Sequence, residues 1–285
     1  MRSATTEEMR MEKFYVKYAD AMDLLTSTKP LPPTKLFDDF AILGGEGTAM
    51  FVLETERGLV LLDAILPGDA FIDIFETGMR ELGYAPEDVT ALLVTHGHFD
   101  HMGIADYLVD TYGIRFYMSE TDYHFGLKDN PERGYEPLHS VPVFLNDDCV
   151  MNFGDKNIQV VQTPGHTPGG LSFVIPVRDE GREKWIALWG GTSLPKETRW
   201  KRAYKESLSH FKMYTDACLV EGEICAHPFM DNTHEKIALQ RNRIYGVPNP
   251  FLMGREGYLR YAGMLMEMTD EALASDSGTG MREQV

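Results

Sequence analysis

The sequence predicts a single α/β domain in which short strands alternate with helices along one chain. Short apolar runs recur between clusters of turn-forming Gly, Pro, Asn and Asp residues, which is typical of strands. Segments with apolar residues at helical spacing stand between these runs. No linker-like stretch divides the 285 residues, and a hydrophobic content of 43% is enough for one sizeable core.

The first half of the chain opens with a lead-in over residues 1–35, polar at first and proline-rich at its end, for which we expect a short helix and then extended chain. The domain itself is expected over residues 36–274. Strands are predicted at Phe40–Leu43, Ala49–Glu54, Leu59–Leu62, Val89–Val94 and Arg115–Met118. Amphipathic helices are predicted at Ala70–Leu82 and Ile104–Tyr112.

The second half begins with residues 128–148, which are rich in Pro, Asn, Asp and Gly and predict a long loop bordering a site. Strands are then predicted at Cys149–Phe153, Ile158–Gln162, Leu171–Ile175, Trp185–Trp189 and Glu223–Ala226. Helices are predicted at Glu206–Cys218, Thr233–Tyr245 and Gly257–Ala274, and a disordered tail at 275–285.

Charge and cysteine content restrict the kinds of partner. Lys and Arg number 27 against 44 Asp and Glu, so the formal net charge is −17, which disfavours nucleic acid and anionic membranes. The charge thus argues against a nuclease role; separately, we expect a small-molecule substrate. Three cysteines without a Cys-x-x-Cys pair fit a reducing compartment. With no signal-peptide pattern at the start and no membrane-spanning run, we expect a cytoplasmic protein; the sequence does not specify its oligomeric state.

The strongest chemical signal lies at Leu92–Gly103, where an apolar run breaks into His96, His98, Asp100 and His101. Four side chains able to bind metal within six residues, at the end of a strand, are hard to explain as packing. Residues i and i+2 of a strand point the same way, so the first two histidines can converge on one ion. Imidazole and carboxylate together suit zinc, and also iron or manganese. The sequence therefore predicts a metal site.

Two further histidines extend this site. His166 lies in Thr-Pro-Gly-His-Thr-Pro-Gly-Gly directly after a predicted strand, and His227 lies in Ile-Cys-Ala-His-Pro-Phe at another strand end. Strand ends can meet at one edge of stacked sheets. We interpret both histidines as additional ligands, and the remaining four, His124, His139, His210 and His234, as surface or loop residues.

The stretch Thr-His-Gly-His-Phe-Asp-His resembles the His-x-His-x-Asp-His signature of the metallo-β-lactamase superfamily. The resemblance covers the chain from about Leu36 to its last helix. It implies a four-layer αββα sandwich, with two mixed sheets packed face to face and helices outside. It also implies two zinc ions, one bound by His96, His98 and His166 and the other by Asp100, His101 and His227.

Within the superfamily the chain looks most like the third subclass of metallo-β-lactamases, which has histidines at all five of these positions. The stretches His227-Pro228-Phe229 and Asn249-Pro250-Phe251 are similar to it. Many superfamily hydrolases carry a metal-bridging aspartate after the Trp185–Trp189 strand, where this chain reads Gly190-Gly191. The third subclass also lacks that bridge, but it commonly has two serines near the substrate here, of which Ser193 survives.

The resemblance implies a zinc-dependent hydrolase in which a metal-bound hydroxide attacks a carbonyl, with β-lactam ring opening the leading reaction. Asp100 would also orient the nucleophile by accepting its hydrogen bond. Asp63 is a candidate for fixing a ligand histidine's tautomer, although a turn role suits it equally, and Ser193 is a candidate substrate contact. Two alternatives stay open: hydrolysis of another ester, lactone or thioester by the same centre, and a non-catalytic metal-dependent binding protein.

Overall fold

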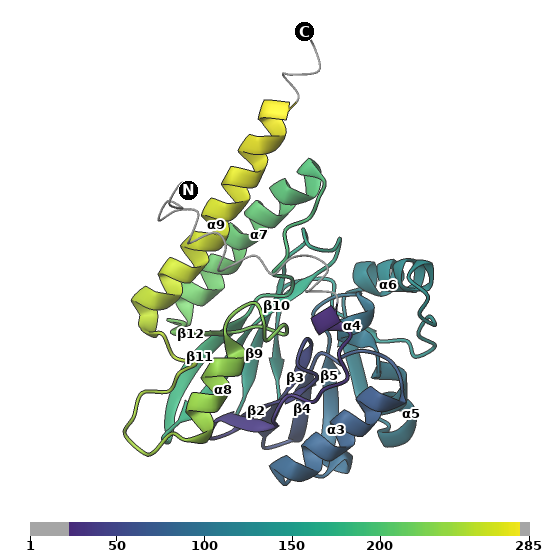
Figure 1. Cartoon of the computed structure of the whole chain (residues 1–285), viewed down its shortest axis with the longest axis vertical. Coiled ribbons are helices and arrows are strands. Elements are labelled where there is room, and N and C mark those ends of the chain that lie inside the picture. Colours follow the sequence, from purple (N-terminus) through teal and green to yellow (C-terminus); the bar gives the residue numbers. More distant parts are fainter. Residues whose placement is uncertain (1–22, 280–285) are drawn as a thin grey trace, which may run out of the picture.

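The computed structural model describes residues 23–279, so most of the lead-in and the last six residues, 280–285, lie outside the described part. The short helix expected within residues 1–35 falls largely in that undescribed segment. The described chain forms two sheets that pack face to face, as Figure 1 shows. Its helices lie on the outer faces of the two sheets, which gives the predicted four-layer αββα sandwich.

The first sheet has seven strands in sequential order. They are β1 (Thr34–Phe37), β2 (Phe40–Gly44), β3 (Ala49–Thr55), β4 (Gly58–Leu62), β5 (Val89–Leu93), β6 (Arg115–Met118) and β7 (Val143–Phe144). The pairs from β1 to β4 are antiparallel and those from β4 to β7 are parallel, so the sheet is mixed. The parallel half requires helical crossovers, which place helices on the outer face.

The second sheet has five strands in the order β12-β11-β10-β9-β8. They are β8 (Cys149–Asn152), β9 (Asn157–Gln162), β10 (Leu171–Asp179), β11 (Arg182–Leu188) and β12 (Gly222–Ile224). Only the pair of β11 with β12 is parallel among the described strands of this sheet, and the other neighbours are antiparallel.

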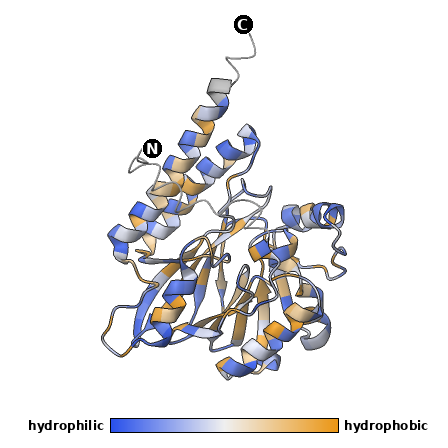
Figure 2. Ribbon diagram, viewed as in Figure 1, coloured by the Kyte–Doolittle hydropathy of each residue, from blue (hydrophilic) through white to orange (hydrophobic). Residues whose placement is uncertain are grey.

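The core follows from the two-residue period of the strands. In β2, Phe40 and Ile42 face the second sheet, whereas Ala41 and Leu43 face the outer helices. Every residue of β2 is buried, because the strand is covered on both faces. Figure 2 shows apolar residues gathered along the strands between the helix layers.

The helices cover both outer faces. On the first sheet lie α3 (Asp69–Leu82), α4 (Phe99–Met102), α5 (Ala105–Tyr112) and α6 (Glu120–Glu132). On the second lie α7 (Thr198–Ala217) and α9 (Gly254–Thr279), and α8 (Thr233–Arg241) packs beside β1. No helix of residues 23–279 is long and apolar enough to cross a bilayer.

Several features differ from the sequence prediction. Helix α6 and strand β1 were not predicted; α6 takes up the start of the expected loop at 128–148, and β7 lies within that loop. Helix α7 begins at Thr198 rather than at the predicted Glu206, and α8 ends at Arg241 rather than at the predicted Tyr245. The tail was predicted as disordered from residue 275, but α9 continues to Thr279. It continues because Asp276 pairs with Lys201 at 2.7 Å and accepts a hydrogen bond from Thr198 at 2.6 Å, which ties α9 to the first turns of α7.

The two sheets are joined at one edge by backbone hydrogen bonds. Leu171 of β10 donates to the carbonyl of Thr95 after β5 (2.7 Å), and Ala49 of β3 donates to the carbonyl of Ala226 after β12 (2.8 Å). These contacts bring the segments that follow β5, β9 and β12 together. All six predicted metal ligands lie on these segments or on α4.

Candidate metal centre

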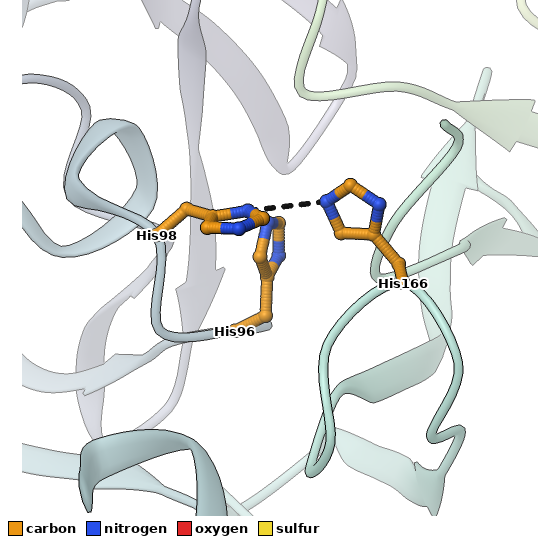
Figure 3. A group of neighbouring side chains, drawn as sticks. All are labelled: His96, His98 and His166. Atoms are coloured by element: carbon orange, nitrogen blue, oxygen red, sulfur yellow. Dashed lines mark hydrogen bonds between the residues drawn. The ribbon is translucent and has the colours of Figure 1, made fainter. Parts of the chain in front are cut away.

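The first group of ligands consists of His96, His98 and His166. The first two lie on the turn between β5 and α4, and His166 reaches them from the facing loop between β9 and β10 (Figure 3). Nδ1 of His98 lies 3.2 Å from Nε2 of His166. The ring of His96 stands within 4.9 Å of both other rings. We call these residues the first trio.

The second group consists of Asp100, His101 and His227, which we call the second trio. Asp100 and His101 lie on the single turn of α4, and His227 follows β12. Nε2 of His101 lies 3.3 Å from Nε2 of His227, and Oδ2 of Asp100 lies 3.5 Å and 3.8 Å from these two nitrogens. Within each trio the potential ligand atoms all lie within 4.8 Å of one another.

The trios lie side by side, since the rings of His96 and His101 have their centroids 3.9 Å apart. Both sheets contribute to both trios. The sequence alone placed these six residues at strand ends, and the structure brings all six together.

Most of the ligand histidines have their second ring nitrogen held in place. Nδ1 of His101 lies 2.8 Å from Oδ2 of Asp63, and Nδ1 of His96 lies 3.0 Å from the hydroxyl of Thr95. The backbone carbonyls of Ser193 and Gly47 stand 2.7 Å and 3.1 Å from Nδ1 of His166 and His227, respectively. Such partners fix the tautomer and leave the other nitrogen free for a metal.

The electrostatics keep the first trio neutral. Burial, with repulsion from neighbouring histidines, lowers the pKa of His96 far below its usual range and that of His98 to about 3. Burial likewise lowers the pKa of His166 to about 4. A neutral imidazole offers the lone pair that a metal requires.

The second trio carries a carboxylate. Burial alone would raise the pKa of Asp100, but His101 and His227 outweigh it and lower that pKa, so the carboxylate is ionised at neutral pH. Burial opposes protonation of His101, but Asp100 and Asp63 raise its pKa. A cation bound at Nε2 would take the place of the proton beside Asp100, while Nδ1 keeps its proton for Asp63.

The donor geometry fits zinc. A tetrahedral zinc ion with Zn–N bonds of about 2.0–2.1 Å separates two ligand nitrogens by roughly 3.3 Å. The nitrogen pairs of the two trios lie at 3.2 Å and 3.3 Å. Nε2 of His96 is buried and has no hydrogen-bond partner in the described chain, as expected of a ligand atom. We therefore find that the residues fit two metal sites.

The absence of a bridging aspartate has a steric basis. A Cβ atom on Gly191 would lie 2.4 Å from Cβ and 2.5 Å from Cγ of His166. A Cβ atom on Gly190 would lie 1.8 Å from the carbonyl oxygen of Leu171. Neither position accepts a side chain while His166 remains in the first trio.

Asp63 and Ser193, which the sequence predicted beside the metal ligands, contact the trios in different ways. Asp63 is fully buried and contacts His101 directly, in the arrangement expected of a residue that fixes a tautomer. Ser193 has an exposed side chain, and the contact it makes to the trio is through its carbonyl. His124 and His139 do not join the trios: His124 packs on Phe144, and His139 pairs with Asp106 and Asp110.

Sequence reasoning missed Thr95, Phe125 and Asp122. Thr95 links His96 to Asp63, and the ring of Phe125 on α6 lies 5.5 Å from that of His98. Asp122 on α6 is buried behind the first trio. The pattern Ser119-x-x-Asp122 was an available signal for a helix start, and Ser119 does cap α6 by accepting a hydrogen bond from the Asp122 backbone. A threonine before a histidine carries no comparable signal.

The four-layer sandwich with two trios at one sheet edge defines a protein of the metallo-β-lactamase fold. Residues 43–179 match the family model described as the metallo-beta-lactamase superfamily, and this range includes the first four ligands and His166. Residues 43–179 therefore carry the sequence of the metallo-β-lactamase superfamily, on a fold that agrees with it.

Comparisons with individual proteins agree with this family. BJP-1 of Bradyrhizobium japonicum, a subclass B3 metallo-beta-lactamase, superposes with a TM-score of 0.75 at 23% identity, covering 91% of this chain and 99% of that one. This likeness shows the fold.

Two curated relatives are similar in sequence. A probable metallo-hydrolase YqgX of Bacillus subtilis is 29% identical over 108 residues, or 35% of this chain and 49% of the relative. The hydroxyacylglutathione hydrolase GloC of Haemophilus influenzae is 30% identical over 110 residues, or 36% of this chain and 49% of the relative. The chain thus matches about half the length of these curated relatives.

Proposed function

We propose that the protein is a zinc-dependent hydrolase that binds two metal ions in the two trios and opens a cyclic amide, with the β-lactam ring as the leading substrate. The observation that carries the proposal is the pair of adjacent trios, in each of which the potential ligand atoms all lie within 4.8 Å of one another. When bound, such ions supply a nucleophile from water at neutral pH and polarise the substrate carbonyl.

The protein's own residues then perform positioning and proton handling. Asp100 is ionised and buried within the second trio, so it can accept a hydrogen bond from an attacking water and orient it. Asp63 holds His101 through Nδ1, and the carbonyl of Ser193 holds His166. These contacts hold the two imidazoles in fixed orientations through the reaction.

The close contact between Gly191 and His166 leaves no room for a metal-bridging carboxylate at position 191. This favours a cyclic amide as the substrate over the substrates of hydrolases that have such a carboxylate. Because no side chain fits at position 191, the site is built without that bridge, as in the third lactamase subclass that the sequence resembles.

A second candidate is hydrolysis of another ester, lactone or thioester by the same centre. It is favoured by the similarity to GloC, which is named a hydroxyacylglutathione hydrolase. Both candidates concern a small-molecule substrate. Three free cysteines support a reducing, cytoplasmic setting for either.

Hydrolysis assays with zinc-loaded protein test the proposal. A chromogenic cephalosporin and a carbapenem are compared with a lactone and an acyl-glutathione, each with and without chelator. Turnover of the first pair that chelator removes and zinc restores is the expected result. His234→Ala serves as a matched control, because His234 bonds the carbonyl of Glu46 and lies outside both trios. Turnover confined to the lactone or thioester would replace the β-lactam proposal with the second candidate, and no turnover of any substrate would contradict both.

A further inference from the structure

The carboxylate of Asp122 sits between the two loops that carry the first trio. It lies on the first turn of α6 and is fully buried. Oδ2 accepts hydrogen bonds from the backbone N–H of Gly97 at 3.0 Å and from the hydroxyl of Thr167 at 2.5 Å. Oδ1 accepts one from the backbone N–H of Gly169 at 2.5 Å.

Two of these three donors are immediate chain neighbours of predicted ligands, and the third, Gly169, lies on the same loop as His166. Gly97 stands between His96 and His98, and Thr167 follows His166. Three donors converging on one buried carboxylate form strong, charge-assisted hydrogen bonds, because the surroundings exclude competing water. One side chain therefore links the two loops that carry the first trio.

Helix α6 also fixes the turn at Gly97 from its other side. Nδ2 of Asn130 donates to the carbonyl of Gly97 at 3.2 Å, so both ends of this residue are bound by α6. A Cβ atom on Gly97 would lie 2.2 Å from the backbone oxygen of Asp122. This close approach requires glycine between the two histidines.

The second trio is supported by other groups. Its histidines are held by Asp63 and by the carbonyl of Gly47, and none of the hydrogen bonds found for the Asp122 carboxylate in residues 23–279 reaches them. Asp63 serves both trios, since it also binds Thr95, whose hydroxyl contacts His96. Of these two buried aspartates, Asp122 therefore binds groups beside the first trio only, whereas Asp63 contacts groups of both trios.

We infer that Asp122 is a positioning residue for the first metal site alone, which sets the affinity of the first trio and leaves that of the second unchanged. The inference rests on the proposed function in requiring that the trios bind metal. A general loss of stability would weaken both sites, so selectivity between them distinguishes positioning from a merely structural role.

Cobalt titrations of metal-free protein, followed by absorption spectroscopy and calorimetry, test this. His227→Ala leaves the first trio as the complete site, and His166→Ala leaves the second. Adding Asp122→Asn should raise the Co²⁺ dissociation constant about 10–100-fold in the His227→Ala background. In the His166→Ala background it should stay within about twofold. Equal weakening in both backgrounds, or no change in either, would overturn the inference.

Asp39→Asn is the matched control, because Asp39 is a second buried aspartate that pairs with Lys156 and accepts from the backbone of Arg178. It should lower thermal stability and leave both cobalt constants unchanged. If Asp122→Asn does not fold, Thr167→Val removes one of the three donors and should give a smaller, equally selective loss; an unselective one contradicts the inference.

The outcomes separate this inference from the proposed function. If the His227→Ala and His166→Ala chains bind cobalt, but neither Asp122→Asn nor Thr167→Val weakens one site selectively, only the role of Asp122 is contradicted. If the two histidine variants bind cobalt, but the wild type hydrolyses none of the four substrates, only the hydrolase proposal is contradicted. A wild type without cobalt binding contradicts both.

Discussion

Nδ1 of His101 and Oδ2 of Asp63 lie 2.8 Å apart in a fully buried contact that couples the end of β4 to the turn of α4. Because a carboxylate accepts, the imidazole donates from Nδ1 and presents Nε2 toward His227. Asp63 adopts a positive φ of 61°, an uncommon conformation that suits a residue held by several hydrogen bonds.

Asp63→Asn removes the charge from this contact and should weaken the second metal site about 10–100-fold, as is usual for the outer partners of ligand histidines. Competition with a chromophoric chelator measures the constant. Asp106→Asn, which alters a carboxylate that binds His139 instead, should leave it unchanged. Equal affinities in all three proteins would remove Asp63 from the support of His101.

His166→Ala and His227→Ala should each lower the metal content by about one ion per chain, because each removes one ligand from a three-ligand site. Elemental analysis after dialysis gives the stoichiometry. His210→Ala is the control, since His210 pairs with Asp148 away from both trios. Unchanged stoichiometry in either variant would exclude that histidine from the ligand set.

Asp100→Asn should preserve the fold and lower kcat by about 10²–10⁴-fold, the usual contribution of a group that handles a proton in the transition state. The physical reason is that the amide keeps the shape of the carboxylate but loses its charge and one acceptor. Circular dichroism and steady-state kinetics measure the two effects. A fully active variant would rule out the proposed role of Asp100.

Gly191→Ala should displace His166, because the new methyl group would lie 2.4 Å from its Cβ. Overpacking of this kind costs about 1–3 kcal/mol of stability, and we also expect weaker binding at the first trio. Gly263→Ala is the matched control, since a Cβ atom there meets nothing within 4 Å and an alanine in a helix is favourable. Retention of full metal affinity by Gly191→Ala would show that the loop adapts.

Glu223 provides a test of pH dependence away from the ligands. Burial and the neighbouring Asp231 raise the pKa of Glu223 to about 8, although Lys236 opposes this. A folded-state pKa above the unfolded value means that folding retains a proton, so its contribution to stability falls as the pH rises from about 4.5 to about 8. Each pH unit in this window is worth at most about 1.4 kcal/mol.

Glu223→Gln removes this titration. The variant should therefore gain stability relative to the wild type as the pH rises from 5 to 8, which denaturant unfolding at several pH values measures. A constant difference across this range would contradict the raised pKa.

The sequence was sufficient to predict that the six residues of the two trios lie close together, because their signal is local. His96 and His98 follow the end of β5, Asp100 and His101 lie on the turn of α4 directly after them, and β5 is defined by its own apolar residues. The facing positions of His166 and His227 also followed, since both stand directly after strands. The fold was predicted to the level of its layers through the family resemblance.

Apart from the Ser119-x-x-Asp122 pattern at its start, helix α6 has little local signal in the sequence, because tertiary contacts stabilise its body. Gly126 and Pro131 both disfavour a helix in isolation. The structure explains the glycine: a Cβ atom at position 126 would lie 2.5 Å from the carbonyl oxygen of Gly97. The role of Asp122 depends on that same approach, so a single sequence does not reveal it.

Each trio takes ligands from both sheets, so an ion bound there would act as a cross-link between segments far apart in the chain. Such an ion binds the folded state in preference to the unfolded one, and stability then rises with free metal concentration. The amount of this protein in a cell would accordingly follow the supply of zinc, because chains without metal unfold more often and are removed by proteases.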